Sequence, residues 1–329
     1  MRDWVVAADD RTGAFEVAAL FAASAGPVTV TVGRPVDGPC VVDLGSRGLD
    51  AAVASAAAAA IEYAPSGWSA HKMDSTLRGN WVAEVRARQA RRGGRVVVLP
   101  GWPALGRTCV DGVVHVHGSP IGSVLDHLPE ASLVRTVAAL GEWLAGGASV
   151  AVCDVPDSAA MQAMASVVAG VEGVLIVGPA GPLGAAFAAR CEVTTPVPTP
   201  PLDDAVLVVC GSANPVSRSQ VERLAVACPD VTILTAPDAE GPLHVGVANE
   251  LAASSHEVAS RLRPATIVLL GGDTAAAYLG DAPRLVGGTV AAGMPWSRDA
   301  DGGGPLVITK AGGFGGPDAL VMLFSPRGA

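Results

Sequence analysis

Lysine is almost absent from this sequence. Of its 22 basic residues only Lys72 and Lys310 are lysines, and the rest are arginines. A GC-rich coding bias gives such a skew wherever either cation suffices, so a retained lysine indicates a site that needs a compact ammonium with rotatable donors. We therefore expect both lysines to lie in functional loops, with chance as the alternative for so small a sample.

Cysteine pairs, basic tracts and unbroken apolar runs are missing too. The six cysteines show no C-x-x-C spacing, so neither a zinc site nor a disulfide framework is indicated, and a reducing cytoplasm is the expected compartment. A net charge of −9 without clustered arginine argues against a nucleic-acid surface. The first residues lack a signal-peptide pattern, and glycines and prolines interrupt the least charged stretch, residues 173–189, so no membrane segment is expected.

The sequence does contain the material for two α/β domains. The chain has 329 residues, half of them apolar and 16% charged, which exceeds one ordinary core and shows little sign of disorder. Short β-branched runs alternate with alanine-rich helical stretches, a pattern typical of a mostly parallel sheet flanked by helices. A proline-rich segment separates two such alternations. We predict an N-terminal domain over residues 1–193, a linker over 194–203 and a C-terminal domain over 204–329.

The same pattern places individual elements. In the C-terminal domain helices begin near Pro215 and Asp273, and strands cover 205–210, 266–270 and 305–309. In the N-terminal domain we expect helices over 13–25, 49–63, 81–92 and 158–169, and strands over 4–8, 28–32, 40–44, 95–99, 149–153 and 174–177.

Polar clusters follow three segments of the first domain. The first strand ends in Asp9 and Asp10, at a carboxyl edge where α/β proteins place ligands, although one Asp can instead cap the next helix. Arg47 can fork onto a carboxylate or lie in solvent. The densest segment, residues 71–80 (HKMDSTLRGN), mixes cations, a carboxylate, hydroxyls and an amide, a composition suited to a polyhydroxylated anion.

Two further features lie beyond this segment. Arg107, in GWPALGRT (101–108), brings another arginine to the same edge or belongs to a structural turn. His115 and His117 alternate as on a strand and could form a metal pair. Without a further ligand at fitting spacing they favour a hairpin surface instead, so no metal-ligand set is predicted.

Three glycine-rich turns each follow a strand of the second domain. Glycine lets the backbone approach a ligand closely, and amides at helix N-termini attract phosphate oxygens. Neither a Walker P-loop nor a strand-led G-x-G-x-x-G is present. Lys310 would add positive charge near phosphates, and three ordinary tight turns with one lysine are the alternative. The turns are CGSAN (210–214), LGGDT (270–274) and TKAGGFGG (309–316).

Together these motifs resemble the four-carbon acid sugar kinase family, formerly a domain-of-unknown-function family of threonate, erythronate and 3-oxo-tetronate kinases. Its typical motifs A-D-D-x-T-G-A, S-R, K-x-D-S-T-L-R-G-N and P-x-x-G-R-T match residues 8–14, 46–47, 72–80 and 103–108. Its later motifs G-S, G-G-[DE]-T, G-x-P and K-x-G-x-F-G match 211–212, 271–274, 293–295 and 310–315. Arg11 replaces an apolar residue of the family, and Gly101-Trp102 replaces Ala-Phe, which leaves the substrate open.

The resemblance implies that the N-terminal domain binds a sugar acid and the C-terminal domain binds ATP. We expect ATP, with Mg²⁺ bridging its phosphates, to phosphorylate the terminal hydroxyl of a four-carbon acid, and Asp9, Asp10 or Asp74 to accept the hydroxyl proton. The expected substrate contacts are Asp10, Arg47, Lys72, Asp74, Ser75, Thr76, Arg78 and Arg107. The expected nucleotide contacts are Ser212, Gly271, Gly272, Asp273, Thr274, Lys310, Gly312 and Gly313.

Two other functions stay open at this point. A kinase of a different small hydroxylated metabolite is supported by Arg11 and the altered loop at 101–102. A sugar-acid or nucleotide sensor without turnover is disfavoured by the retained lysines and carboxylates, and a dehydrogenase by the missing dinucleotide fingerprint. The expected partners are small molecules, with no nucleic acid and no membrane, and a homodimer is an open expectation.

Overall fold

The computed structural model describes residues 4–61, 68–191, 197–202, 205–237 and 245–324. The chain forms two compact units, Met1–Pro196 and Val197–Ala329, which we call the N-terminal and C-terminal units and describe separately. Residues 194–196 and 203 of the predicted linker lie outside the described residues. In the described part of the chain, no helix has both the length and the apolar character that crossing a bilayer requires.

The N-terminal unit is built on a parallel sheet. Its described strands are ordered β2, β3, β1, β4, β11, β5, β10, β9, and each neighbouring pair is parallel. The register puts Asp43, Ala8 and Lys72 in one row, so three strands end together at one carboxyl edge. The strands are β1 (Trp4–Ala8), β2 (Val28–Val32), β3 (Cys40–Asp43), β4 (Trp68–Lys72), β5 (Arg95–Val98), β9 (Ser132–Val134), β10 (Val150–Cys153) and β11 (Val174–Gly178).

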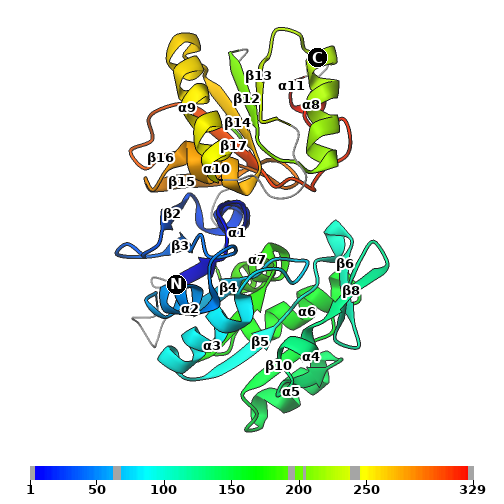
Figure 1. The fold of residues 1–329 in the computed structure, drawn as a ribbon. Helices are drawn as coiled ribbons and strands as arrows, with labels where there is room; N and C mark the ends of the chain where they lie inside the picture. The colour runs from blue at the N-terminus through cyan, green and yellow to red at the C-terminus, as the bar shows by residue number, and fades with distance from the viewer. Residues whose placement is uncertain (1–3, 62–67, 192–196, 203–204, 238–244, 325–329) are drawn as a thin grey trace. The chain divides into compact units, whose positions relative to one another are not determined.

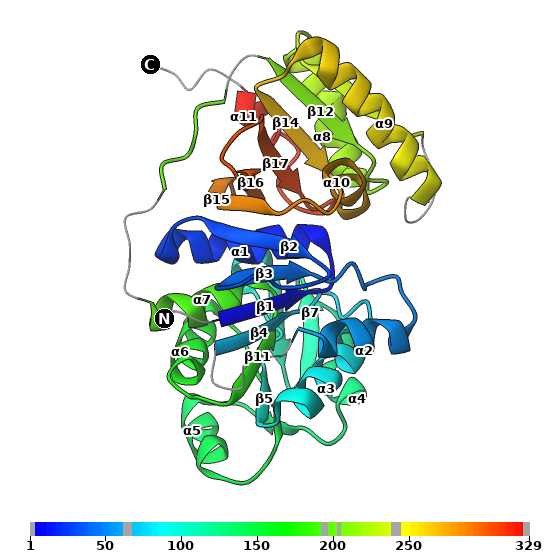
Figure 2. The same cartoon turned by 90° about the vertical axis from the view of Figure 1, so that its left-hand side faces the viewer.

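Helices cover both faces of this sheet, with α2 and α3 on one face and α6 and α7 on the other (Figure 2). Asp10, Asp50 and Asp157 cap α1, α2 and α6, because each carboxylate accepts a hydrogen bond from a backbone N–H of the first turn. The helices are α1 (Arg11–Ala25), α2 (Ala51–Ala59), α3 (Trp81–Arg92), η1 (Pro103–Leu105), α4 (Val124–His127), α5 (Val137–Ala145), α6 (Ser158–Ala169) and α7 (Ala180–Arg190).

An aromatic cluster joins α1 and α7 to the sheet. Phe21 of α1 stacks on Phe187 of α7 with the ring centroids 3.8 Å apart. Trp4 of β1 and Trp68 of β4 meet both rings in edge-on geometry, which suits the quadrupoles of aromatic rings. Because aromatic residues make up only 4% of the chain, this cluster concentrates much of the large apolar surface at one place.

A small antiparallel sheet, β6 (Arg107–Val110), β7 (Val113–Val116) and β8 (Ser119–Ser123), is attached to the main one. A bridge between Cys109 and Val155 joins it to the segment after β10. Asp111 and Gly112 form its first turn, with φ of 52° and 74°, the left-handed values that a two-residue hairpin turn requires. The Asp154 carboxylate accepts hydrogen bonds from both of their backbone N–H groups and so fixes the turn.

The C-terminal unit has a mixed sheet in the described order β13, β12, β14, β17, β16, β15, parallel up to β17 and antiparallel beyond it. Val208 packs with α8 and α11 whereas its neighbour Val209 packs with α9 and α10, because successive side chains of a strand face opposite layers. Figure 1 shows these helices on the two sides of this sheet. The elements are β12 (Val206–Cys210), α8 (Pro215–Ala227), β13 (Thr232–Thr235), α9 (Val245–Leu262), β14 (Thr266–Leu270), α10 (Gly272–Leu279), β15 (Arg284–Ala291), β16 (Met294–Asp299), β17 (Leu306–Lys310) and α11 (Val321–Phe324).

The predicted α/β fold class is confirmed, whereas several strands were missed, among them β4 and β15. Strand β4 reads WSAHK, too polar for a buried strand, yet every residue is buried because β1 and β11 pair on either side of it. Strand β15 contains Gly287, a turn signal in sequence, but a Cβ there would lie 2.1 Å from the ring of Trp296 on β16. The helix expected over 49–63 spans Ala51–Ala59, and positions 62–63 lie outside the described residues.

Replacing Phe187 with alanine tests the aromatic cluster. The Phe187→Ala substitution opens a cavity against Phe21 and both tryptophans, so we expect it to lower the free energy of unfolding by about 3–5 kcal/mol in urea denaturation. Val226→Ala is the control, because that side chain is 86% exposed and its loss should cost less than about 0.5 kcal/mol. Equal losses for the two variants would contradict this account of the core.

Candidate active site

The carboxyl edge of β1, β3 and β4 gathers residues from three loops. Asp9 follows β1 directly, is fully buried, and its backbone carbonyl accepts hydrogen bonds from the N–H groups of Ser46 and Arg47 at 3.0 and 3.1 Å. The loop after β3 is therefore fixed against the end of β1. Lys72 is the last residue of β4 and is 4% exposed.

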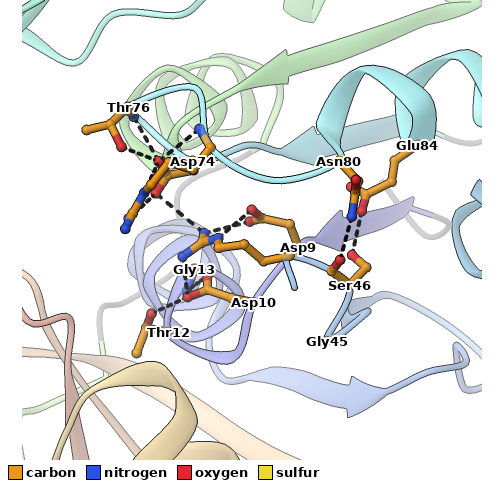
Figure 3. A network of polar contacts seen from close by, with 12 residues as sticks. Asp9, Asp10, Thr12, Gly13, Gly45, Ser46, Asp74, Thr76, Asn80 and Glu84 are labelled. Atoms are coloured by element: carbon orange, nitrogen blue, oxygen red, sulfur yellow. Dashed lines mark hydrogen bonds and ion pairs between the residues drawn. The ribbon is translucent and has the colours of Figure 1, made fainter. Parts of the chain in front are cut away.

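Arg47 connects the acidic groups of this edge. Its Nε and Nη2 donate to the two carboxylate oxygens of Asp9 at 2.8 and 2.9 Å, and its Nη1 donates to Asp10 at 2.9 Å. Asp74 lies 3.6 Å from Nη2, which makes a third ion pair. Figure 3 shows Asp9 and Asp10, from the segment after β1, close to Asp74, from the segment after β4. Arg47 was predicted to bind substrate; the structure first gives it the role of neutralising these aspartates, and substrate contact stays a prediction.

Two of the three aspartates predicted as bases are held in the ionised form. Burial raises the pKa of Asp10, but the Arg47 and Lys72 charges and the Thr12 and Gly13 hydrogen bonds outweigh it, and the net pKa is lowered. Burial also raises the pKa of Asp74, yet hydrogen bonds from Arg78 outweigh it. Both carboxylates are weak bases as a result.

Asp9 differs from these two aspartates. Burial raises its pKa more than the Arg47 charge lowers it, and both of its oxygens accept hydrogen bonds from that guanidinium. Because the Asp9 side chain is fully buried, a substrate hydroxyl would need a path past Arg47 to reach it. Its role as the base stays a prediction.

The segment after β4 turns sharply and places the other predicted substrate residues. The carboxylate of Asp74 accepts hydrogen bonds from the backbone N–H and hydroxyl of Thr76, while Ser75 is partly buried and the Arg78 side chain is 66% exposed. Leu77 has a φ of 64° and Gly79 a φ of 83°, so the chain reverses through left-handed conformations.

A buried polar layer supports Ser46 and hence the loop that carries Arg47. The Ser46 hydroxyl donates to Glu84 at 2.5 Å, and the Asn80 side-chain amide donates to the Ser46 carbonyl at 2.9 Å (Figure 3). Glu84 also lies 2.9 Å from His71 Nε2, and neither side chain is exposed. His71 and Asn80, both from the polar segment 71–80, therefore have a structural role: they support the loop that carries Arg47.

Glu16, which our sequence reasoning missed, also belongs to this edge. It lies on α1 one turn beyond Gly13, and a Cβ on Gly13 would be 2.7 Å from the Lys72 ammonium. Burial raises the pKa of Glu16 to about 7, against the opposing charges of Lys72 and Arg107. A helix-interior glutamate gives no sequence signal; its spacing from the A-D-D-x-T-G motif is the only clue.

Arg107 and the histidine pair show how the hairpin region is used. Arg107 begins β6, and its Nη1 donates to the carbonyl of Leu105; burial lowers its pKa. His115 lies on β7, but His117 has a φ of 49° in the turn after it, so the two imidazoles do not alternate along one strand. The hairpin interpretation holds for the pair, and the described residues contain no group of three or more His, Cys, Asp or Glu that could bind a metal.

In the C-terminal unit the three glycine turns lie together at the ends of β12, β14 and β17. A Cβ on Gly312 would be 2.6 Å from the Ser212 hydroxyl, and one on Gly271, whose φ is 110°, would be 3.2 Å from Thr274 Oγ1. The Thr274 hydroxyl is buried with no hydrogen-bond partner among the described residues. Gly272 and Asp273 open α10, and Gly313 lies in the third turn. Glycine at positions 271 and 312 thus leaves room beside the Ser212 and Thr274 side chains, and the Asn214 side chain also lies beside Gly312.

Lys310 supports the third turn from within. Its ammonium donates to the carbonyls of Ala311 at 3.1 Å and Gly312 at 3.5 Å and to the Ser217 hydroxyl at 3.4 Å, and the residue is fully buried. Burial lowers its pKa to about 8. The sequence predicted a charge facing phosphates; the structure shows a lysine beneath the turn, and direct nucleotide contact stays a prediction.

Comparison with known proteins places the chain. A family model described as a sugar-binding N-terminal domain matches residues 4–132. D-threonate kinase of Bordetella bronchiseptica is 30% identical over 76% of this chain and 75% of its own length. The chain belongs to the four-carbon acid sugar kinase family.

One further relative and one solved structure bear on the extent of the match and on the fold. D-threonate kinase of Cupriavidus necator is 32% identical over 67% of this chain, and that match spans 63% of the relative's length. The crystal structure of a Haemophilus influenzae protein from a domain-of-unknown-function family is similar with a TM-score of 0.69, covering 95% of this chain and 97% of that one. At 20% identity, this structural likeness concerns the fold alone.

The ion pairs of Arg47 predict a pH-dependent loss on substitution. Arg47→Ala leaves Asp9, Asp10 and Asp74 without their shared counter-charge, so we expect the free energy of unfolding at pH 7 to fall by about 3 kcal/mol or more. The lowered pKa values of Asp10 and Asp74 mean that this contribution is present above their ordinary pKa of 3.8 and lost as the pH falls further. Chemical denaturation at pH 7 and pH 3 measures both; Arg91→Lys on α3 is the control. A difference independent of pH would contradict the ion-pair account.

Glu16 predicts the opposite pH dependence. Its folded pKa of about 7 exceeds the ordinary 4.5, so the wild-type protein loses stability as the pH rises from about 4.5 through 7. Glu16→Gln removes this loss, and at pH 8 we expect the variant to be more stable by on the order of 2–3 kcal/mol, with little difference at pH 4.5. Glu142→Gln, an exposed position on α5, should show no such trend in the same denaturation series.

Proposed function

We propose that this chain is an ATP-dependent kinase that phosphorylates the terminal hydroxyl of a small sugar acid, a four-carbon acid such as a threonate, an erythronate or a 3-oxo-tetronate. One observation carries the proposal. In each unit several parallel strands end together at one edge of the sheet; in the N-terminal unit charged side chains line this edge, and in the C-terminal unit glycine-rich turns do. The first suits a hydroxylated acid and the second suits phosphate. Family membership and two D-threonate kinase relatives support the same assignment.

The cationic side chains that could bind a substrate carboxylate differ in how many ion pairs they already form with acidic residues. Arg47 is shared among three aspartates, and Arg78 is paired with Asp74. Lys72 lies near Gly13 at the start of α1, and its charge also acts on Asp9, Asp10 and Glu16 without a direct ion pair to them among the described residues. Lys72 is our candidate to hold the acid, with Arg107 as a second group, and the hydroxyls of Ser75 and Thr76 suit the sugar-acid hydroxyls.

The glycine turns of the C-terminal unit fit ATP phosphates. A side chain at Gly271 or Gly312 would fill the space beside Ser212 and Thr274, and the buried Thr274 hydroxyl has a donor to offer. Backbone amides of residues 271–274 and 312–313 would hold phosphate oxygens. Mg²⁺ would neutralise phosphate charge, and in such sites it is usually bound by one or two carboxylates together with the substrate phosphates.

The two departures from the family pattern are absorbed by packing. Arg11 donates to Asp43 at 2.6 Å in a buried ion pair, so its charge is used within the fold. A Cβ on Gly181 of α7 would lie 2.4 Å from the Trp102 ring, so the larger Trp102 is accommodated by a glycine. Neither change alone argues for another substrate. A kinase of another hydroxylated metabolite and a sensor without turnover remain the alternatives, and a homodimer stays a prediction.

A coupled ATP-consumption assay over a panel of tetronates, longer aldonates and neutral polyols tests the proposed function. We expect ADP release with a tetronate and a product heavier by one phosphoryl group in mass spectrometry. Lys72→Arg should lower kcat/KM for the acid by roughly 100-fold, because a planar guanidinium cannot fit beside Gly13, while KM for ATP changes little. Arg91→Lys, an exposed position on α3, is the control. Binding of acid and ATP without ADP release would favour the sensor.

A further inference from the structure

The carboxyl edge of the N-terminal unit contains one carboxylate, that of Glu16, to which no role has been assigned. Asp9, Asp10 and Asp74 each accept hydrogen bonds from an arginine, and the latter two also from backbone N–H groups. Among the described residues, no hydrogen bond or ion pair engages the carboxylate of Glu16. This side chain is partly exposed, so it is open to a ligand in a way that fully buried Asp9 is not.

The position of Glu16 on α1 directs it toward the site. Side chains of an α-helix point back toward its N-terminus, and residues three apart are neighbours on one face. Glu16 therefore extends over the first turn of α1, above Gly13, and α1 begins at the carboxyl edge of β1. The ammonium of Lys72 lies on this same face, since a Cβ on Gly13 would come 2.7 Å from it.

The charges around Glu16 come from every loop of the site. Burial raises its pKa to about 7, Asp10 raises it further, and Lys72, Arg107 and Arg47 lower it. A carboxyl group that titrates near neutral pH is a far stronger base than Asp10, whose pKa is lowered, and still ionises under working conditions. The three cations around it would also hold an anionic substrate within reach of its oxygens.

We propose that Glu16 is the catalytic residue that accepts the proton of the attacking hydroxyl. This inference rests on the proposed function. The hydroxyl oxygen of the acid forms a bond to the γ-phosphorus of ATP, while the bond between that phosphorus and the β–γ bridging oxygen breaks and ADP leaves with the electron pair. The hydroxyl proton passes to the Glu16 carboxylate and from there to water, so the products are the phosphorylated acid, ADP and one proton. Asp9, Asp10 and Asp74 then serve to hold Arg47 and the loops.

The test is the pH profile of kcat for wild type, Glu16→Gln and Glu16→Asp with the acid that wild type uses best. Wild-type kcat should fall about tenfold per pH unit below an apparent pKa near 7. Glu16→Gln should lose roughly 100-fold or more of kcat and the acidic limb, with KM for ATP unchanged. Glu16→Asp should keep the acidic limb at an intermediate kcat, which a purely structural role would not produce. Glu142→Gln on α5 should keep the wild-type profile.

The outcomes separate this inference from the proposed function. If wild type phosphorylates an acid and Glu16→Gln keeps kcat within threefold and retains the acidic limb, Glu16 is not the base and only this inference falls. A Glu16→Asp variant as slow as Glu16→Gln, with no acidic limb, would overturn it as well. If wild type transfers phosphate to no acid in the panel, both statements fall together, and that result is read from wild type alone.

Discussion

The guanidinium of Arg47 neutralises a set of carboxylates that could not otherwise share one buried edge. It bonds both oxygens of Asp9, one of Asp10, and lies within ion-pair distance of Asp74, so it ties together the segments after β1 and β4 from its own place after β3. Buried like charges repel strongly when a counter-charge is absent. The geometry of the N-terminal edge therefore depends on this one side chain and on the Ser46, Asn80 and Glu84 contacts that position its loop.

The charges at this edge also explain why its carboxylates differ in basicity. Arg47 and Arg78 hold Asp10 and Asp74 ionised, and the bonds they make leave those carboxylates little basicity. Glu16 sits outside these bonds, where burial dominates and its pKa moves toward neutrality. Two kinds of carboxylate thus arise from environment alone, one kind that holds the loops and another suited to take up a proton.

At the corresponding edge of the C-terminal unit, glycines stand where larger side chains would fill the space. Gly271 and Gly312 keep the space beside Ser212 and Thr274 open, while Ser217, Gln220 and Lys310 bond the backbone of the third turn from below. A buried lysine donating to carbonyls stiffens a turn that glycines would otherwise leave loose. Both lysines of the chain occupy tight sites, Lys72 against Gly13 and Lys310 beneath its turn.

The sequence alone determined the α/β class, the positions of β1, β2 and β14 and the polar segments at strand ends, because apolar periodicity and turn chemistry are local. It did not reveal β4, whose Ser69, His71 and Lys72 are buried only because neighbouring strands and α3 supply partners. Nor did the sequence distinguish Glu16 from surface glutamates. It also did not show that Arg47 forms ion pairs with aspartates or that Lys310 donates hydrogen bonds to backbone carbonyls. Burial decides these roles, and the Asp9 partner of Arg47 and the Ser217 contact of Lys310 lie 38 and 93 positions away, so only the folded chain brings them together.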